Sequence, residues 1–232
     1  MKYLKLTVFT IFMFLTTGVL ISISINPWFS LNLFEQEFMN TRLNYQLSGL
    51  VLAMVTLGIT YLFADKIRLG YLNFNREGKL LTERYLGINE EGVWKEDGWS
   101  YGLIMMVIMG ITAFVGVFQA GFSFSLTNSL IAIIFAATNA FTEEVIFRLS
   151  YVTMGANETS SNRYGIIMGS IVFGIIHYFG IMPNGIIGVI LSLFLGYFLT
   201  KSMQETKGFF WAFMIHFMLD IVIMLLLFNA RM

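Results

Sequence analysis

The chain has 232 residues, of which 57% are hydrophobic and only 12% are charged. Soluble domains carry roughly 25% charged residues, and a soluble fold of this size could not keep so much apolar surface away from water. The formal net charge is zero, so no basic surface for nucleic acid is expected. The absence of cysteine excludes disulfides, thiolate metal sites and a cysteine nucleophile. The composition therefore predicts an integral membrane protein.

Apolar runs follow one another along the chain at lengths near the ~20 residues that a helix needs to cross a bilayer. The seven runs cover residues 4–25, 46–64, 101–121, 127–153, 164–180, 185–200 and 209–228. The runs are continuous, without the alternation of barrel strands, and an open sheet edge cannot lie in lipid. We therefore predict an all-α polytopic membrane protein of about seven transmembrane helices, with residues 1–232 forming a single membrane domain. Residues 1–121 would supply the N-terminal helices and a loop at about 65–99, and residues 122–232 the part that carries the motifs below.

The distribution of lysine and arginine predicts the orientation of these helices. Lys2 and Lys5 precede the first run as in a signal peptide, but the length of the run and its poor cleavage sequence at 24–27 favour a retained helix. If the N-terminus lies inside, 11 of the 14 basic residues lie on the cytoplasmic side. These are Lys2, Lys5, Lys66, Arg68, Arg76, Lys79, Arg84, Lys95, Arg163, Lys201 and Lys207. The other side receives only Arg42 and Arg231, so we predict an N-in, C-out protein that crosses the cell membrane several times.

The predicted loop at about 65–99 is the one sizeable segment outside the apolar runs, and it holds most of the charge. We expect an amphipathic connector exposed to solvent. A substrate-recruiting or interfacial role is the alternative.

Ionisable residues inside the apolar runs from residue 101 onward are few. They are Glu143, Glu144, Arg148, His177, His216 and Asp220, and they include both histidines of the chain. Such a residue costs several kcal/mol at the membrane centre unless it is paired or hydrated, and it usually marks a functional site. We therefore expect these residues to converge in one polar pocket.

The spacing of the acidic residues separates their roles. Glu144 and Arg148 are four residues apart, so they share a helical face in the favourable order for an ion pair. Glu143 points about 100° away and stays free to act as a general base. The alternative is a buried ion-pair cluster that only holds helices together.

Each of the two histidines also has a functional and a purely structural interpretation. His177 lies alone on an apolar helix, where a histidine is usually a packing residue with one hydrogen bond. His216 and Asp220 share a face, so Asp220 can orient the imidazole, share a metal or bind a water. The alternative for this second pair is a hydrogen bond within the helix.

Three motifs carry a resemblance to a known family. They are Glu143-Glu144-x-x-x-Arg148, Phe173-x-x-x-His177 and His216-x-x-x-Asp220, in this order on separate apolar runs. This pattern resembles the CPBP family of type II CAAX prenyl proteases and bacteriocin-processing proteins, also called Abi, over residues 127–220. In the better-known prenyl proteases the last position is usually Asn, so Asp220 departs from the pattern.

The resemblance implies a catalytic role for four residues. Glu143 would activate water with help from His177, while His216 and Asp220 would hold the oxyanion or the water. Three further residues would support the site: Glu144, Arg148 and Phe173. Members are often described as metalloproteases, so Zn²⁺ held by His177 and His216 is one expectation. Water activation without metal is the other, since no HExxH occurs. No organic cofactor is expected.

The function expected from these features is an intramembrane endopeptidase that cuts membrane-associated peptides or proteins, with lipid around it and no nucleic acid partner. We expect its active site to open toward the cytoplasmic side. A non-catalytic membrane partner, for bacteriocin immunity or sensor regulation, is one alternative. A proton-coupled transporter is another, but no paired helices interrupted by Gly or Pro suggest an inverted repeat.

Overall fold

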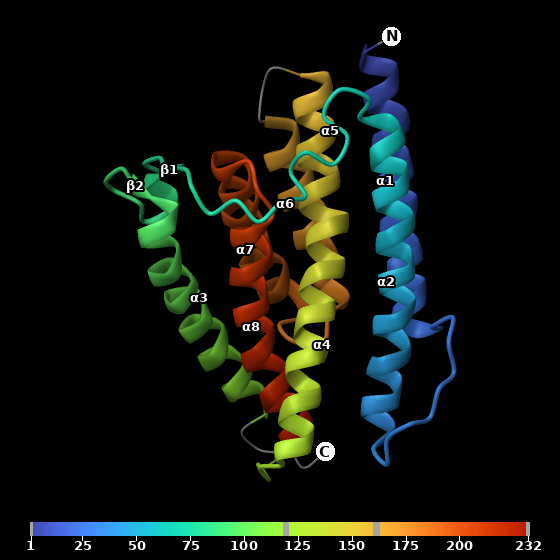
Figure 1. The fold of residues 1–232 in the computed structure, drawn as a ribbon. Coiled ribbons are helices and arrows are strands. Elements are labelled where there is room, and N and C mark those ends of the chain that lie inside the picture. The colour runs from blue at the N-terminus through green and yellow to red at the C-terminus, as the bar shows by residue number, and fades with distance from the viewer. Residues whose placement is uncertain (1, 118–120, 160–162, 231–232) are drawn as a thin grey trace.

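A computed structural model describes residues 2–117, 121–159 and 163–230, which are mostly helical (Figure 1). The helices are α1 (Lys2–Ile25), α2 (Glu37–Phe63), α3 (Trp94–Val117), α4 (Leu126–Glu144), α5 (Ser150–Glu158), α6 (Arg163–Ile176), α7 (Gly185–Thr206) and α8 (Phe210–Asn229). A π-helical turn, Val145–Leu149, joins α4 to α5 without a break. Within these ranges six helices are long and apolar enough to cross a membrane, with α4 to α5 counted as one, and α6 is a shorter apolar helix. The predicted all-α polytopic fold is confirmed.

The helices stand side by side as a bundle with two distinct ends (Figure 1). One end, called here the hairpin end, carries the N-terminus and the connector from α2 to α3, which includes the short strands β1 (Lys79–Leu80) and β2 (Gly92–Val93). The other end, called here the far end, carries the connector 26–36 and the C-terminus. Helix α4 packs along α8, and α6 packs along α7.

Close approach of α6 to its neighbours depends on a small residue. A methyl group added at Gly169 would lie 2.6 Å from the carbonyl oxygen of Phe147, in the π-helical turn. The backbone of α6 therefore lies directly against the turn that contains Arg148. This is the use that small residues have in membrane helix packing.

The connector between α2 and α3 is anchored to the bundle as well as exposed. Trp211 Nε1 donates to the carbonyl of Arg76 at 3.0 Å, and the Tyr197 hydroxyl donates to Glu83 at 2.8 Å. Leu80 is buried among the helix ends. The expected amphipathic connector is thus present, but it is held to α7 and α8 instead of lying free in solvent.

Three helices extend furthest beyond the limits that the apolar runs predicted. Helix α2 begins at Glu37, nine residues before the predicted start, because its polar first turns are satisfied by the preceding loop. For example, the side-chain oxygen of Asn44 accepts a hydrogen bond from Leu31 N at 2.8 Å. Helix α3 begins at Trp94 with acidic residues in its first turn, where they favour a helix N-terminus. Helix α7 continues to Thr206 through a polar last turn. Hydropathy does not detect such polar helical turns.

Candidate active site

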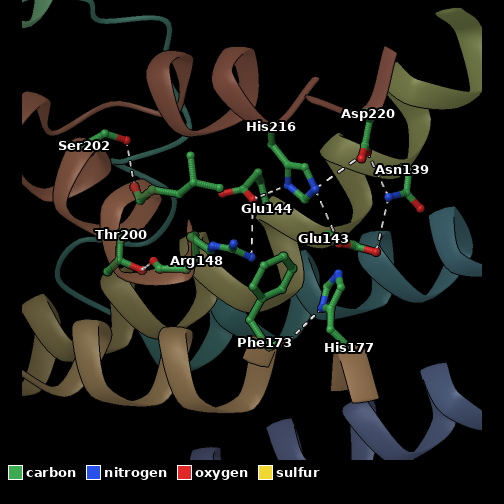
Figure 2. A network of polar contacts seen from close by, with 12 residues as sticks. Asn139, Glu143, Glu144, Arg148, Phe173, His177, Thr200, Ser202, His216 and Asp220 are labelled. Atoms are coloured by element: carbon green, nitrogen blue, oxygen red, sulfur yellow. Dashed lines mark hydrogen bonds and ion pairs between the residues drawn. The ribbon is translucent and has the colours of Figure 1, made fainter. Parts of the chain in front are cut away.

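The ionisable residues singled out in the sequence come together from three parts of the bundle (Figure 2). Helix α4 supplies Glu143, helix α8 supplies His216 and Asp220, and the turn after α6 supplies His177. All four line one pocket of about 210 Å³. A water occupies about 30 Å³ in the liquid, so the pocket can hold several waters or part of a peptide. Four of the six residues expected in one pocket thus line it, whereas Glu144 and Arg148 are fully buried and do not. The chemical roles stay predictions.

The imidazole of His216 lies between carboxylates from two helices. Its Nδ1 is 2.6 Å from Glu144 Oε1. Its Nε2 is 3.6 Å from Glu143 Oε2 and also 3.6 Å from Asp220 Oδ2. An ionised carboxylate only accepts hydrogen bonds, so Glu144 fixes Nδ1 as a donor and sets the orientation of the ring.

The residue that orients His216 therefore differs from the one that its own helix suggested. The i,i+4 spacing gave orientation of the ring as one of three possible roles for Asp220, but Glu144 makes the shorter contact because α4 packs along α8. Asp220 lies on the Nε2 side, toward the pocket.

Asn139 links the two carboxylates of the pocket, and its role was not predicted. Its Nδ2 donates to Glu143 Oε1 at 3.2 Å and to Asp220 Oδ2 at 3.0 Å. Its Oδ1 accepts from Gln46 Nε2 of α2 at 3.1 Å. One side-chain amide thus satisfies two acids from different helices. The signal was available in part, because Asn139 lies one helical turn before Glu143.

The predicted pair of Glu144 and Arg148 is confirmed. Arg148 Nη1 lies 3.3 Å from Glu144 Oε1, and both side chains are fully buried. The guanidinium carbon of Arg148 lies 3.6 Å from the centre of the Phe173 ring, a cation–π contact. The π-helical turn that contains Arg148 directly follows Glu144, and such turns are frequent at functional sites.

His177 begins a single 3₁₀ turn, His177–Phe179, that ends α6. Its Nδ1 lies 2.8 Å from the carbonyl oxygen of Phe173. A carbonyl only accepts, so Nδ1 carries the hydrogen and Nε2 is left for other partners. The imidazole points toward Glu143 in Figure 2. The Phe173 ring packs against both imidazoles, with centroid distances of 4.3 Å to His177 and 5.7 Å to His216.

Helix α2 brings a positive charge to the pocket wall. Arg42 and Tyr45 both line the pocket, with the Arg42 guanidinium carbon 4.8 Å from the centre of the Tyr45 ring. Among the lining residues that the structure describes, Arg42 is the only arginine or lysine. It therefore offsets part of the negative charge of Glu143 and Asp220. Hydropathy does not indicate this role, because Arg42 precedes the apolar run of the helix.

The two predicted zinc ligands, His177 and His216, both line this pocket. Within the described ranges no group of three or more His, Asp or Glu side chains is placed to hold a metal ion. Nδ1 of His216 faces Glu144 and Nδ1 of His177 faces a backbone carbonyl, which leaves the Nε2 atom of each ring as its possible metal ligand. A zinc site at these two histidines stays a prediction.

Most residues that line the pocket lie in the half of the bundle nearer the far end. They come from the last turns of α1, the first turns of α2, the second half of α3, the end of α4, the end of α6 and the turn after it, the first half of α7 and both halves of α8. Helix α6 has 14 residues, which span about 21 Å, less than the ~30 Å of a bilayer core. The turn from α6 to α7 consequently stops short of the far end (Figure 1).

This position bears on two sequence-based predictions. With the N-terminus inside, the far end is the external end. The predicted N-in orientation and the predicted cytoplasmic opening of the site both stay predictions.

Comparison with known proteins adds one finding. Residues 124–222 match the family model described as type II CAAX prenyl endopeptidase Rce1-like. No curated protein matches the chain, and no solved structure does either. The matched region includes all three motifs and the whole of α4 to α7.

Proposed function

The match of residues 124–222 to the type II CAAX prenyl endopeptidase Rce1-like model supports the CPBP family, and on this premise we propose that the protein is an intramembrane endopeptidase. The observation that carries the proposal is the convergence of Glu143, His177 and His216 on one pocket within a bundle of membrane-spanning helices. A purely structural ion-pair cluster does not need a cavity beside it. Here the general base, a second imidazole and a donor all face the same space.

Glu143 is the general base in this proposal. Its Oε1 accepts from Asn139, and its buried Oε2 has no hydrogen-bond partner among the described residues and lies 3.6 Å from His216 Nε2. A water in the pocket can donate to Oε2 and attack the carbonyl carbon of a peptide bond while Glu143 takes its proton. His177 accepts a second hydrogen bond from that water through Nε2 and so orients it.

His216 stabilises the intermediate. Attack by water gives a tetrahedral carbon with a negatively charged oxygen, and a donor fixed before the reaction stabilises that charge. Because Glu144 holds Nδ1, the Nε2 atom is aimed into the pocket and donates to the oxyanion in the doubly protonated imidazole. Arg148 holds Glu144 in turn, so the support extends from the π-helical turn to the site.

The cycle closes when the intermediate collapses. The carbon–nitrogen bond breaks, the leaving amine takes the proton that Glu143 had accepted, and a new carboxyl terminus forms. Water is thus divided between the two products, and the protein returns to its starting state. The substrates proposed are membrane-associated peptides or proteins, and the residues of the site do not require that they be prenylated.

Proteolysis of a panel of membrane peptides by the purified protein tests this proposal. Glu143→Gln keeps the size of the side chain and an oxygen that can accept from Asn139, but it cannot take a proton at neutral pH. We expect cleavage to fall by at least ~10²-fold. Glu90→Gln, the same change at an exposed position, is the matched control and should cleave like wild type. If Glu143→Gln cleaves at the control rate, the site is not a protease site, and a non-catalytic membrane partner becomes the better account.

A further inference from the structure

The open part of the pocket is built from the far half of the bundle. Ser24 lies at the end of α1, and Gly180 and Ile181 lie in the turn from α6 to α7. The side chain of Ile181 is 48% exposed, and Ser24 is exposed as well. No residue of the connector at the hairpin end lines the pocket. The pocket is therefore separated from the hairpin end by the packed halves of α4, α7 and α8.

The two ends of the bundle differ strongly in positive charge. Eleven of the 14 lysines and arginines belong to the hairpin end or to the chain segments next to it. At the far end the structure describes one, Arg42, and this side chain lines the pocket instead of facing the headgroups. Lysine and arginine in short loops and near helix ends stay on the cytoplasmic side. The hairpin end is thus the cytoplasmic end.

From these two observations together we infer that the pocket opens toward the external side of the membrane. Its substrates then present the cleaved bond in the outer half of the bilayer or just above it. This inference differs from the sequence-based expectation of a cytoplasmic opening, which was made without knowledge of the helix halves that surround the cavity.

The exposed residues at the rim of the pocket also indicate which kind of peptide segment can enter it. Phe179 and Ile181 are exposed beside the opening, at 65% and 48%, while the charged groups lie deeper. An apolar, extended peptide segment from a polypeptide anchored in or inserted into the outer leaflet fits such a rim. That statement about substrates rests on the proposed protease function, whereas the side on which the pocket opens does not.

Cysteine accessibility tests the inference on the whole protein and needs no substrate. The chain has no cysteine, so the wild type gives no background with a maleimide reagent. Ser24→Cys and Ile181→Cys report on the rim. Ser30→Cys in the connector 26–36 and Asn89→Cys in the α2–α3 connector are exposed references for the far end and the hairpin end.

On intact cells a membrane-impermeant maleimide should label the Ser24→Cys, Ile181→Cys and Ser30→Cys variants, and should label Asn89→Cys only after permeabilisation. Labelling of Asn89→Cys on intact cells would show the opposite orientation and overturn the inference. So would rim cysteines that react only with a membrane-permeant maleimide, because the pocket would then be closed to external water. Neither result depends on whether Glu143→Gln loses proteolysis, so the two proposals fail separately.

Discussion

Replacement of Arg148 by methionine is the perturbation whose size the structure defines best. Methionine keeps an unbranched chain of similar length but removes the charge, so the buried volume stays nearly filled. Arg148 lies 3.3 Å from Glu144 with both side chains fully buried. Breaking a buried pair by removing one partner costs about 3–5 kcal/mol, because the remaining charge is left in an apolar environment.

The other contact of Glu144 places this cost near the lower limit. His216 Nδ1 stays 2.6 Å from the same carboxylate oxygen, so Glu144 keeps one partner after the change. We therefore expect a loss of about 3 kcal/mol in the free energy of unfolding. For a chain of this length about 1 kcal/mol corresponds to 2–4 °C in Tm. The expected fall in Tm is thus roughly 6–12 °C, measured by thermal unfolding in detergent.

An exposed ion pair provides the control. Lys95 and Glu77 lie closer together, at 2.8 Å, but their side chains are 61% and 62% exposed. Exposed pairs contribute about 0–1 kcal/mol, so Lys95→Met should melt close to wild type. If Arg148→Met also melts like wild type, burial of the pair does not stabilise the bundle and this reasoning is refuted.

Further predictions address the site, the packing, the hairpin end and the topology. Asn139→Leu should lower kcat/KM at least ~10-fold and change the dependence of kcat/KM on pH, while the protein is still produced at normal yield. The reason is that two carboxylates lose a shared donor worth ~1.5–3 kcal/mol per hydrogen bond. An unchanged pH dependence would contradict this role. Gly169→Ala should destabilise by about 1–3 kcal/mol in thermal unfolding, because the added methyl meets a carbonyl oxygen at 2.6 Å. The hydrogen bond from Lys5 lowers the pKa of Asp65 to about 2 from 3.8, so this contact stabilises the fold above about pH 4 and is lost as the pH falls toward 2. NMR titration of the Asp65 carboxyl should show its pKa rising toward the ordinary value in Lys5→Met. Reporter fusions after residue 90 should read cytoplasmic and fusions at the C-terminus external, and a cytoplasmic signal at both would contradict the N-in, C-out orientation.

Hydropathy predicted the membrane helices well where the chain is apolar and poorly where it is polar. Helix α8 lies within one residue of the run 209–228, because nearly all of its residues are apolar. The predicted start of α2 was nine residues too late, because the first turns of this helix carry polar residues such as Arg42 and Asn44. Those polar turns face a loop and the pocket, and only the tertiary structure shows that they are covered.

The same division holds for the site. Spacing along one helix predicted the pair of Glu144 and Arg148, and the structure contains it. Contacts between helices could not be obtained in this way, because they depend on how α4 packs on α8. For that reason the sequence indicated only Asp220 as a residue that could orient His216, whereas Glu144 makes the shorter contact. The bridge through Asn139 depends on Gln46 from a third helix and was missed for the same reason.

The central claim is that residues from three helices act as one hydrolytic site, and the rates of two single variants and their double variant test it most directly. Glu143→Gln and His177→Ala should each lose most of the cleavage rate. If both groups act on the same water, their losses are not additive, and the double variant should be little slower than the slower single variant. Losses that multiply would show independent contributions, and a double variant that still cleaves at the wild-type rate would contradict the account.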